Sequence, residues 1–458
     1  MDGSRVHGLA WQGGGMGRRV SEVARQVGVE EPPRLSGECR RRYCLKTGQA
    51  RVETRRSTRR RSASASRRDG DARMRPVAIV GVGSTPFGRL EGRDIVSLAV
   101  DAGREALQDA GLPVDRVESL YLGNFIGERV AGQGALAPLV TRRLGFRGIP
   151  ATKVEGACAS GGIALRHGFL TVAAGIHDCV LVVGVEKMSH LPTGEITAAL
   201  STAGDEGAEM RTGLTFPGTF AMIMEEHMAR YGTTREQIAK VSVKNHDNGA
   251  ANPKAQFQRR TDVNEVVNSR FVAEPIRLFD CPPISDGAAA AVVCSLDVAA
   301  EVSSEPVRIL GSGQASGPGS LSDMDELTSF PATLTAVREA YAMAGVGPED
   351  IDVAEVHDCF TIAEIVATED LGFVAAGEGG PTLDTGETAL GGRLPVNPSG
   401  GLIAKGHPVG ASGVAQIYEL VRQLHGTAIN QVIGAEIGLA HNLGGSGAAA
   451  TVHILGLE

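Results

Sequence analysis

EGACASGG at residues 155–162 and KGHPVGASG at residues 405–413 decide the fold. In both stretches small residues form a Gly-rich turn that opens a helix, which indicates two similar halves in one chain. Two such halves meeting back to back would bring the two helix starts together. We therefore expect the chemistry of the protein at this meeting point.

Around the first stretch, short apolar runs alternate with helical periodicity. The run at residues 76–83 predicts a buried strand, and residues 94–112 predict a helix capped by Asp94 and stopped by Gly111. The same alternation continues with strands near 117–124, 150–156 and 179–186 and helices near 135–145 and 158–175. It predicts right-handed crossovers over a largely parallel, buried α/β sheet.

Residues 190 to about 280 interrupt this pattern and predict an inserted loop domain with two helices, around Phe220–Arg230 and Arg235–Asn248. A second round follows, with a strand beginning at 306, another at 352–358 and a helix from about 405. The expected division is an N-terminal half over 74–300, which includes the loop domain, and a C-terminal half over 301–458.

The composition fits a globular protein that is neither exported nor inserted in a membrane. With 458 residues and 42% apolar content, the chain can bury large cores. It contains no apolar run of 18 residues and no signal-peptide pattern. The seven cysteines form no CxxC pair, so we expect free thiols in a reducing, cytoplasmic compartment.

Residues 1–73 differ from the rest of the chain in charge. They carry 18 Arg and Lys against 8 Asp and Glu, whereas the whole chain has a net charge of −8. This stretch is predicted to be disordered, and we expect that Met74 is the true start of the protein. The alternatives are a nucleic-acid-binding arm, which would need interleaved aromatic residues, or a transit peptide, which would be poor in acidic residues.

Cys158 is the candidate nucleophile. It lies at a predicted helix start, where unpaired N–H groups and the helix dipole favour a thiolate. Its neighbours are small, which leaves room for a bulky acyl group. Taken alone, Cys158 would be interpreted as a buried structural thiol.

His407 and the VHDCF segment at 356–360 supply the other reactive groups. His407 opens the matching helix of the second half, from which it could take the Cys158 proton, although a His before Pro also suits a turn. His357 and Cys359 lie two residues apart and would point the same way in an extended strand, with Asp358 as a turn or cap residue. Cys359 is otherwise interpreted as a packed thiol.

From residue 76 onward the chain resembles a thiolase, more narrowly the sterol carrier protein type and the related archaeal and actinobacterial acetyl-CoA acetyltransferases. The motifs that carry the resemblance are VEGACASGG, GVEKMS at 184–189, SDGAAAA at 285–291, HDCF, and NPSGGLIAKGHPVGASG, in family order. The resemblance implies duplicated βαβ halves in a five-layered αβαβα arrangement. It also implies Claisen condensation of two acyl-CoAs, or thiolysis of a 3-oxoacyl-CoA.

Roles follow from the resemblance residue by residue. Cys158 would be the acyl-accepting nucleophile, His407 its base and an oxyanion donor, and His357 a group that polarises the thioester oxygen. The backbone N–H of Cys158 and one near Gly444 would form a second oxyanion site. Most thiolases place a second Cys in a C-terminal CxGGG segment, where this chain has AHNLGGSG. Cys359 is therefore assigned the acid/base role, with His441 as the alternative.

Substrate and partner expectations are less specific. Ser285, Arg230, Lys244 and His246 are candidates for coenzyme A contacts, as are Lys254 and Arg259, although most would be ordinary surface charges. We expect coenzyme A thioesters as substrates, no permanent cofactor and no metal, and a homodimer or homotetramer. The competing interpretations are a ketoacyl synthase-like enzyme and a thiolase-like subunit acting with a small OB-fold partner.

Overall fold

Residues 74–457 are those that the structure, a computed structural model, describes. The predictions for residues 1–73 lie outside the described residues. The strands of the main sheet are β1 (Val77–Ser84), β2 (Ser119–Gly123), β3 (Ala151–Val154), β4 (Cys179–Glu186), β7 (Gly287–Ser295), β8 (Val307–Ser316), β9 (Val353–Glu355), β10 (Ile437–Gly444) and β11 (Ala449–Gly456).

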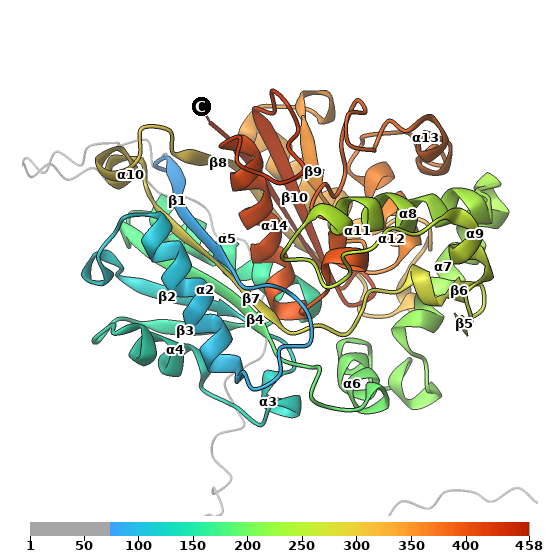
Figure 1. Cartoon of the computed structure of the whole chain (residues 1–458), viewed down its shortest axis with the longest axis horizontal. Coiled ribbons are helices and arrows are strands. Elements are labelled where there is room, and N and C mark those ends of the chain that lie inside the picture. Colours follow the sequence, from blue (N-terminus) through green and yellow to red (C-terminus); the bar gives the residue numbers. More distant parts are fainter. Residues whose placement is uncertain (1–73, 458) are drawn as a thin grey trace, which may run out of the picture. The chain divides into compact units, whose positions relative to one another are not determined.

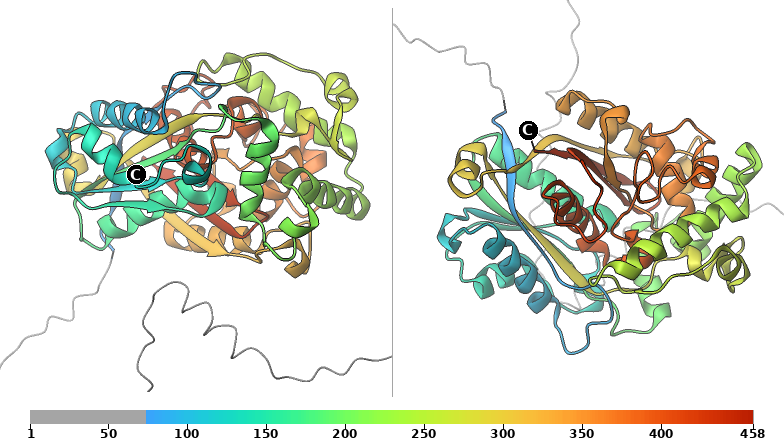
Figure 2. Two further views of the ribbon diagram at one scale, coloured as in Figure 1. Left: turned by 90° about the horizontal axis from the view of Figure 1, so that it is seen from below. Right: turned by 45° about the horizontal axis from the view of Figure 1, so that its top comes forward.

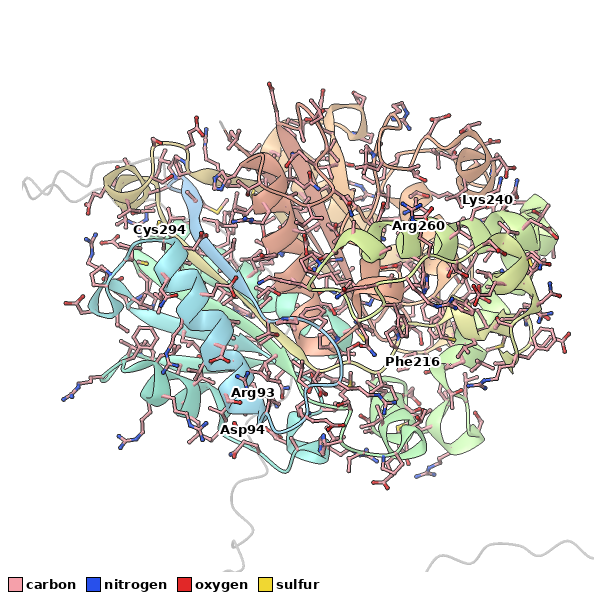
Figure 3. The ribbon with its side chains drawn as sticks, in the orientation of Figure 1. Arg93, Asp94, Phe216, Lys240, Arg260 and Cys294 are labelled. Carbon is pink, nitrogen blue, oxygen red and sulfur yellow. The ribbon has the colours of Figure 1, made fainter. Side chains whose placement is uncertain are left out.

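The helices follow the predicted alternation. They are α2 (Ile95–Asp109), α3 (Gly127–Val130), α4 (Leu136–Leu144), α5 (Ser160–Ala173), α6 (Thr193–Leu200), α7 (Phe216–Tyr231), α8 (Arg235–Ala251), α9 (Val263–Asn268), α10 (Leu296–Val302), α11 (Pro331–Ala344), α12 (Thr361–Asp370), α13 (Gly379–Thr385) and α14 (Val409–Leu424). Asp94 caps α2 as predicted, because its carboxylate accepts the Ser97 N–H at 2.8 Å. Figure 3 labels Asp94 at this helix start.

The strands lie in the order β3-β2-β4-β7-β1-β8-β11-β10-β9. Only the pairs β2/β3, β2/β4 and β9/β10 are parallel; the five pairs across the middle are antiparallel. The prediction of a largely parallel sheet is therefore wrong. The long insertion returns the chain antiparallel to β4, and β10 and β11 form a hairpin, neither of which requires a crossover helix.

The sheet is buried on both faces, and its alternating residues show which helices cover each face. In β4, Leu181 and Val183 belong to the core that α2 and α4 cover, whereas Val180 and Val182 belong to the core that contains α5 and α14. In β11, Val452 faces the third core, with α11 and α12. These cores give five layers, α2/α4, strands, α5/α14, strands and α11/α12 (Figure 1).

The middle layer positions the site, because α5 comes from the first half and α14 from the second. Only two residue pairs join the halves of the sheet, Ala78 with Arg308 and Ile79 with Val307. The two helices therefore pack between strands of both halves. Their close packing depends on glycines: a Cβ on Gly161 would lie 2.9 Å from the Gly410 carbonyl oxygen.

The insertion between β4 and β7 contains α6 to α9 and a small hairpin, β5 (Phe271–Ala273) with β6 (Ile276–Arg277). The two predicted helices are present as α7 and α8. Phe220 of α7 and Ile238 of α8 pack in the same core as α12. Figures 1 and 2 show these green helices beside the orange and red elements of the second half. The insertion therefore borders the second half of the chain.

Within residues 74–457, no helix combines the length and the apolar character that crossing a membrane would require.

Candidate active site

Cys158 lies in a tight turn between β3 and α5, in the short 3₁₀ segment Ala157–Ala159. The preceding Ala157 has φ +52°, an uncommon backbone conformation for a residue with a side chain. Its N–H donates to the Glu155 carboxylate at 2.6 Å, and its carbonyl accepts from the Ser160 hydroxyl at 2.6 Å. These bonds hold the strained turn and present the Cys158 side chain.

The Cys158 thiol is half-buried, and burial raises its pKa to about 12. The backbone N–H groups of Gly445 and of Cys158 itself bond to the sulfur and only partly offset this effect. Burial therefore outweighs the helix-start N–H groups that were expected to favour a thiolate, and the thiol needs a base. The N–H that reaches the sulfur belongs to Gly445, one residue beyond the predicted Gly444.

His407 reaches the site through an unusual turn. Residues Gly401–Lys405 form one turn of π-helix, and Gly406 follows with φ +118°. The carboxylate of Asp358, predicted as a turn or cap residue, accepts the N–H groups of Leu402 and Ile403 at 2.6 and 3.2 Å. The turn that carries His407 is therefore tied to the HDCF segment.

The His407 ring is neutral and aims one nitrogen into the site. Its Nδ1 lies 2.8 Å from the Ser412 hydroxyl, which in turn donates to the Pro408 carbonyl at 3.3 Å. Both contacts are satisfied together when Nδ1 carries the proton. Nε2 is buried and has no hydrogen-bond partner among the described residues. Burial lowers the pKa of His407 to about 3, so this nitrogen keeps its lone pair at neutral pH.

His357 lies beyond the end of its strand. β9 ends at Glu355, so the expected extended segment through residue 358 is wrong. The following residues turn to place His357, which is buried, with Nδ1 3.0 Å from Asn442 Nδ2. Burial, and then the neighbouring His407 and His441, lower the pKa of His357 well below its usual value.

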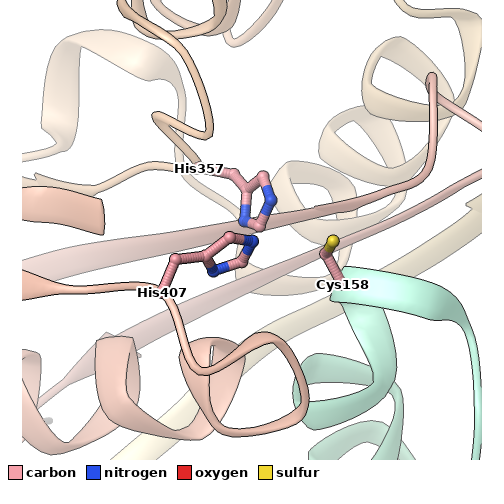
Figure 4. Close-up of side chains that lie close together, drawn as sticks. All are labelled: Cys158, His357 and His407. Carbon is pink, nitrogen blue, oxygen red and sulfur yellow. The ribbon is translucent and has the colours of Figure 1, made fainter. Parts of the chain in front are cut away.

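The structure brings Cys158 and His407 together, as the duplicated turns predict, and places His357 beside them. One ring nitrogen of each imidazole and the sulfur of Cys158 all lie within 4.8 Å of one another. The rings of His357 and His407 meet edge to face, with centroids 5.0 Å apart. Figure 4 shows Cys158 approaching from the first half and the two histidines from the second.

Cys359 is buried just before α12, where the backbone N–H groups of Cys359 and Phe360 bond to its sulfur. Burial raises its pKa well above that of a free thiol, and the nearby Cys158 raises it further. The premise that Cys359 keeps a free-thiol pKa is therefore wrong. The Cys359 thiol is therefore protonated in the free enzyme.

His441 occupies the opposite face of β10 from Asn442. Its Nε2 lies 3.0 Å from the hydroxyl of Thr333 on α11, in the outer layer. Burial lowers its pKa to about 3. The structure therefore directs His441 away from the layer that holds Cys158, which weakens the case for it as a proton shuttle.

Two of the candidate coenzyme A contacts have their polar groups engaged. The side chain of Lys244 is only 8% exposed, and its ammonium bonds to Asn245 Oδ1 and the Val396 carbonyl, both at 2.6 Å, and pairs with Glu364 at 3.0 Å. All three donors are in use, so the prediction of a phosphate contact is wrong for Lys244.

His246 is likewise unsuited to a phosphate. Its side chain is buried, its Nδ1 contacts the Ser242 carbonyl at 2.9 Å, and burial lowers its pKa, which leaves the ring neutral. Arg230 is exposed and pairs with Glu326 at 2.7 Å, while Arg259 pairs with Glu265. These two arginines are accessible but are already paired with carboxylates.

Ser285 has a structural contact that the sequence did not suggest. Its hydroxyl is buried, donates to Gln256 Oε1 at 2.6 Å and accepts the backbone N–H of His407 at 3.0 Å. Ser412 and Asn442, which contact the two histidines, were also not predicted. Their signals were present in the KGHPVGASG and AHNLGGSG segments, but spacing alone does not show which ring nitrogen a side chain reaches.

The same trio could offer a sulfur and two nitrogens to a thiophilic cation such as Zn²⁺. A histidine that binds zinc normally donates its second ring N–H to an acceptor. Ser412 can serve His407 in this way, but Asn442 presents an amide N–H donor to His357. The trio therefore fits a nucleophile with its base and a hydrogen-bond donor better than it fits a metal centre.

Comparisons with known proteins agree with this geometry. A family model described as "Thiolase, N-terminal domain" matches residues 77–297, and one described as "Thiolase C-terminal domain-like" matches residues 313–457. The acetyl-CoA acetyltransferase of Methanothermobacter thermautotrophicus is 49% identical over 83% of this chain and 99% of its own length. That of Methanocaldococcus jannaschii is 42% identical, with the same coverage.

A solved structure described as "Ltp2-ChsH2(DUF35) aldolase" matches with a TM-score of 0.73 at 30% identity, over 83% of this chain and 98% of that one. The two family models together span most of the described residues. The chain therefore belongs to the thiolase family.

Proposed function

We propose that this protein is an acyl-CoA C-acyltransferase that carries an acyl group on Cys158. The observation that carries the proposal is the convergence of Cys158, His357 and His407, whose reactive atoms lie within 4.8 Å of one another. A nucleophile beside an oriented base is the arrangement that covalent acyl transfer requires.

In the first half-reaction, His407 Nε2 removes the Cys158 proton and the sulfur attacks the thioester carbon of an acyl-CoA. The N–H groups of Cys158 and Gly445 stabilise the developing oxyanion. The C–S bond to coenzyme A breaks, and the Cys359 thiol protonates the departing thiolate. The products are an acyl-Cys158, an imidazolium at His407 and a thiolate at Cys359.

In the second half-reaction, the Cys359 thiolate removes a proton from the α carbon of a second acyl-CoA. His357 and the His407 imidazolium donate hydrogen bonds to its thioester oxygen, which takes up the enolate charge. The enolate attacks the acyl group, and the released Cys158 thiolate recovers a proton from His407. A 3-oxoacyl-CoA leaves; the reverse direction is thiolysis.

An apolar cluster next to Cys158 supports an acyl group as the transferred unit. The partly buried Cys158 packs against an apolar cluster that contains Ile126, Val130, Met188, Ile196 and Val409. An acyl chain on the sulfur would therefore meet hydrocarbon instead of charge. The substrates of the proposal are coenzyme A thioesters, and no bound cofactor is required.

A ketoacyl synthase-like reaction is the competing mechanism, because a Cys with two His also serves decarboxylating condensation. The family match and the acetyl-CoA acetyltransferase relatives do not favour it. Release of carbon dioxide from malonyl-CoA by the purified protein would reverse this preference.

The remaining elements of the proposal concern assembly and location. We place the protein in the cytoplasm as a homodimer or homotetramer and keep the division into halves at 74–300 and 301–458. The solved aldolase relative has a DUF35 component in its name, which supports a small OB-fold protein as a further partner. Co-purification with such a protein encoded nearby would test this point.

Intact-protein mass spectrometry after incubation with acetyl-CoA tests the central claim. Wild-type protein should gain one acetyl group, and Cys158→Ala should gain none. Cys281→Ala is a matched control, because Cys281 is also half-buried with a pKa raised to about 12 by burial. An acetyl group that persists in Cys158→Ala would refute the assignment, as would its loss in Cys281→Ala alone.

A further inference from the structure

Asn442 of β10 connects two parts of the active centre. Its side chain is buried, its Nδ2 lies 3.0 Å from His357 Nδ1, and its Oδ1 lies 3.2 Å from the backbone N of Gly162 on α5. Asn442 therefore spans from the helix that follows the nucleophile to one of the two catalytic imidazoles.

The orientation of this amide is fixed by its partner on α5. Gly162 offers a backbone N–H, which can only donate, so the amide oxygen must face it. The amide nitrogen is then directed at His357. Because an NH₂ group can only donate, His357 Nδ1 must be the acceptor.

Two glycines make room for the amide between the helices of the middle layer. A Cβ at Gly413 of α14 would lie 2.2 Å from Asn442 Oδ1, and one at Gly162 would lie 3.1 Å from it. The amide thus occupies a cradle at the crossing of α5 and α14. A residue that merely filled space there would not need a polar group directed at an imidazole.

An imidazole that accepts at Nδ1 and is neutral must carry its proton on Nε2. We propose that Asn442 is a positioning residue that holds His357 in the Nε2–H form, so that this nitrogen is a hydrogen-bond donor for the substrate's thioester oxygen. This inference rests on the proposed acyl transfer. It assigns to the AHNLGGSG segment, which lacks the usual Cys, a role in the reaction.

The two histidines then have opposite roles, because the group next to Nδ1 accepts a hydrogen bond in one case and donates one in the other. The Ser412 hydroxyl accepts from His407 Nδ1, which leaves Nε2 with a lone pair for the Cys158 proton. The Asn442 amide donates to His357 Nδ1, which leaves Nε2 with a proton. One ring is thereby a base and the other a donor, although both are buried and neutral.

The decisive variant is Asn442→Asp, which keeps the size of the side chain. One carboxylate oxygen still accepts the Gly162 N–H, while the other accepts a hydrogen bond from His357 Nδ1, which requires the imidazole proton to be on Nδ1. We expect the condensation kcat to fall about 100-fold, the loss typical of one oxyanion donor. Acetylation of Cys158 should fall less, because its oxyanion site uses backbone N–H groups.

Nitrogen-15 NMR of histidine-labelled protein reads the tautomer directly and needs no substrate. The His357 signals, assigned through His357→Ala, should show Nε2 protonated in the wild type and Nδ1 protonated in Asn442→Asp. Protonation of Nδ1 in the wild type would overturn the proposal even if Asn442→Asp failed to fold. Because the protein is free of substrate, this result is independent of whether acyl transfer itself is correct.

A double-mutant cycle separates positioning from general stability. In a His357→Ala background, Asn442→Asp should cause little further loss of condensation. Gln416→Glu is the matched control, since Gln416 is a buried amide of α14 that bonds to the His441 carbonyl at 2.8 Å and makes no hydrogen bond to His357. An equal loss from Asn442→Asp in both backgrounds, or an equal loss from Gln416→Glu, would overturn the positioning role.

Discussion

The backbone N–H of His407 donates a 3.0 Å hydrogen bond to the hydroxyl of Ser285, 122 residues earlier in the chain. The Ser285 hydroxyl in turn donates a hydrogen bond to Gln256 Oε1, between α8 and α9 of the insertion. The turn that carries the base is thus anchored to the first half, which carries the nucleophile.

Removing this anchor should weaken both stability and catalysis. Ser285→Ala leaves the buried His407 N–H without a partner, which costs about 1–3 kcal/mol in the free energy of unfolding. A shift of the imidazole should also lower kcat about tenfold. Chemical denaturation and steady-state kinetics measure the two effects. Ser295→Ala, which removes the cap of α10 far from the site, should reduce stability with kcat unchanged.

The assignment of the second thiol predicts a split between the two half-reactions. Cys359→Ala should still acetylate Cys158, although more slowly, but its condensation and thiolysis should fall at least 100-fold because no group removes the α proton. His441→Ala should retain condensation within about tenfold, since its contact is with Thr333 in the outer layer. Full activity in Cys359→Ala, or a larger loss in His441→Ala, would reverse the assignment.

The buried histidine predicts an unusual pH profile for acylation. Burial lowers the pKa of His407 to about 3 and raises that of Cys158 to about 12, so neither group titrates in the free enzyme near neutrality. The base is neutral above its lowered pKa, so kcat/KM for acetylation should be flat from about pH 5 to 9. Stopped-flow measurements of acetylation across this pH range check the prediction. A fall in kcat/KM as pH drops below about 6.5 would show that His407 keeps an ordinary pKa.

Asp370 offers a test of stability against pH. Its carboxylate accepts the Phe330 N–H at 2.7 Å and the Ser329 hydroxyl at 2.6 Å, and burial raises its pKa to about 7. Between pH 4 and 7 the folded state therefore binds more protons than the unfolded state, and stability falls as pH rises. Asp370→Asn keeps both contacts but does not ionise. Its free energy of unfolding should therefore exceed that of the wild type by up to roughly 4 kcal/mol at pH 7.

An exposed carboxylate should change stability with pH in the opposite direction. Hydrogen bonds from Gln237 and Lys240 lower the pKa of Asp384. Asp384→Asn should therefore be less stable than the wild type above about pH 4, and this difference in the free energy of unfolding should shrink as pH falls below that value. Urea titrations at a series of pH values would show both trends. If the free energies of unfolding of Asp370→Asn and the wild type differed by the same amount at every pH, the raised pKa of Asp370 would be contradicted.

The order of the elements could be predicted from the sequence because each strand is a short apolar run and each helix has its own period. β4 lies at the predicted residues 179–186, and α7 and α8 cover the predicted helices. Strand direction could not be predicted in the same way. An apolar run such as β7 is buried on both faces in either direction, and the chain reverses within the insertion.

The convergence of Cys158 and His407 was predictable because their turns are duplicated in the sequence. The protonation state of each group could not be predicted from the sequence. Helix-start N–H groups favour a thiolate, but the burial of Cys158 outweighs them, and only packing shows which effect is larger. The phosphate contact predicted for Lys244 was wrong for a related reason. A lysine in a polar helix can point inward when buried carbonyl and carboxylate oxygens are placed to accept its hydrogen bonds.

The crossing of α5 and α14 has a consequence for protein engineering. Replacing helical glycines by alanine is a common route to a more heat-resistant enzyme, because it restricts the unfolded chain. At Gly413 the added methyl group would collide with the amide of Asn442, and at Gly161 with the carbonyl of Gly410. Thermostabilised variants of this protein should therefore be sought in its outer helices, with the central pair left as nature has it.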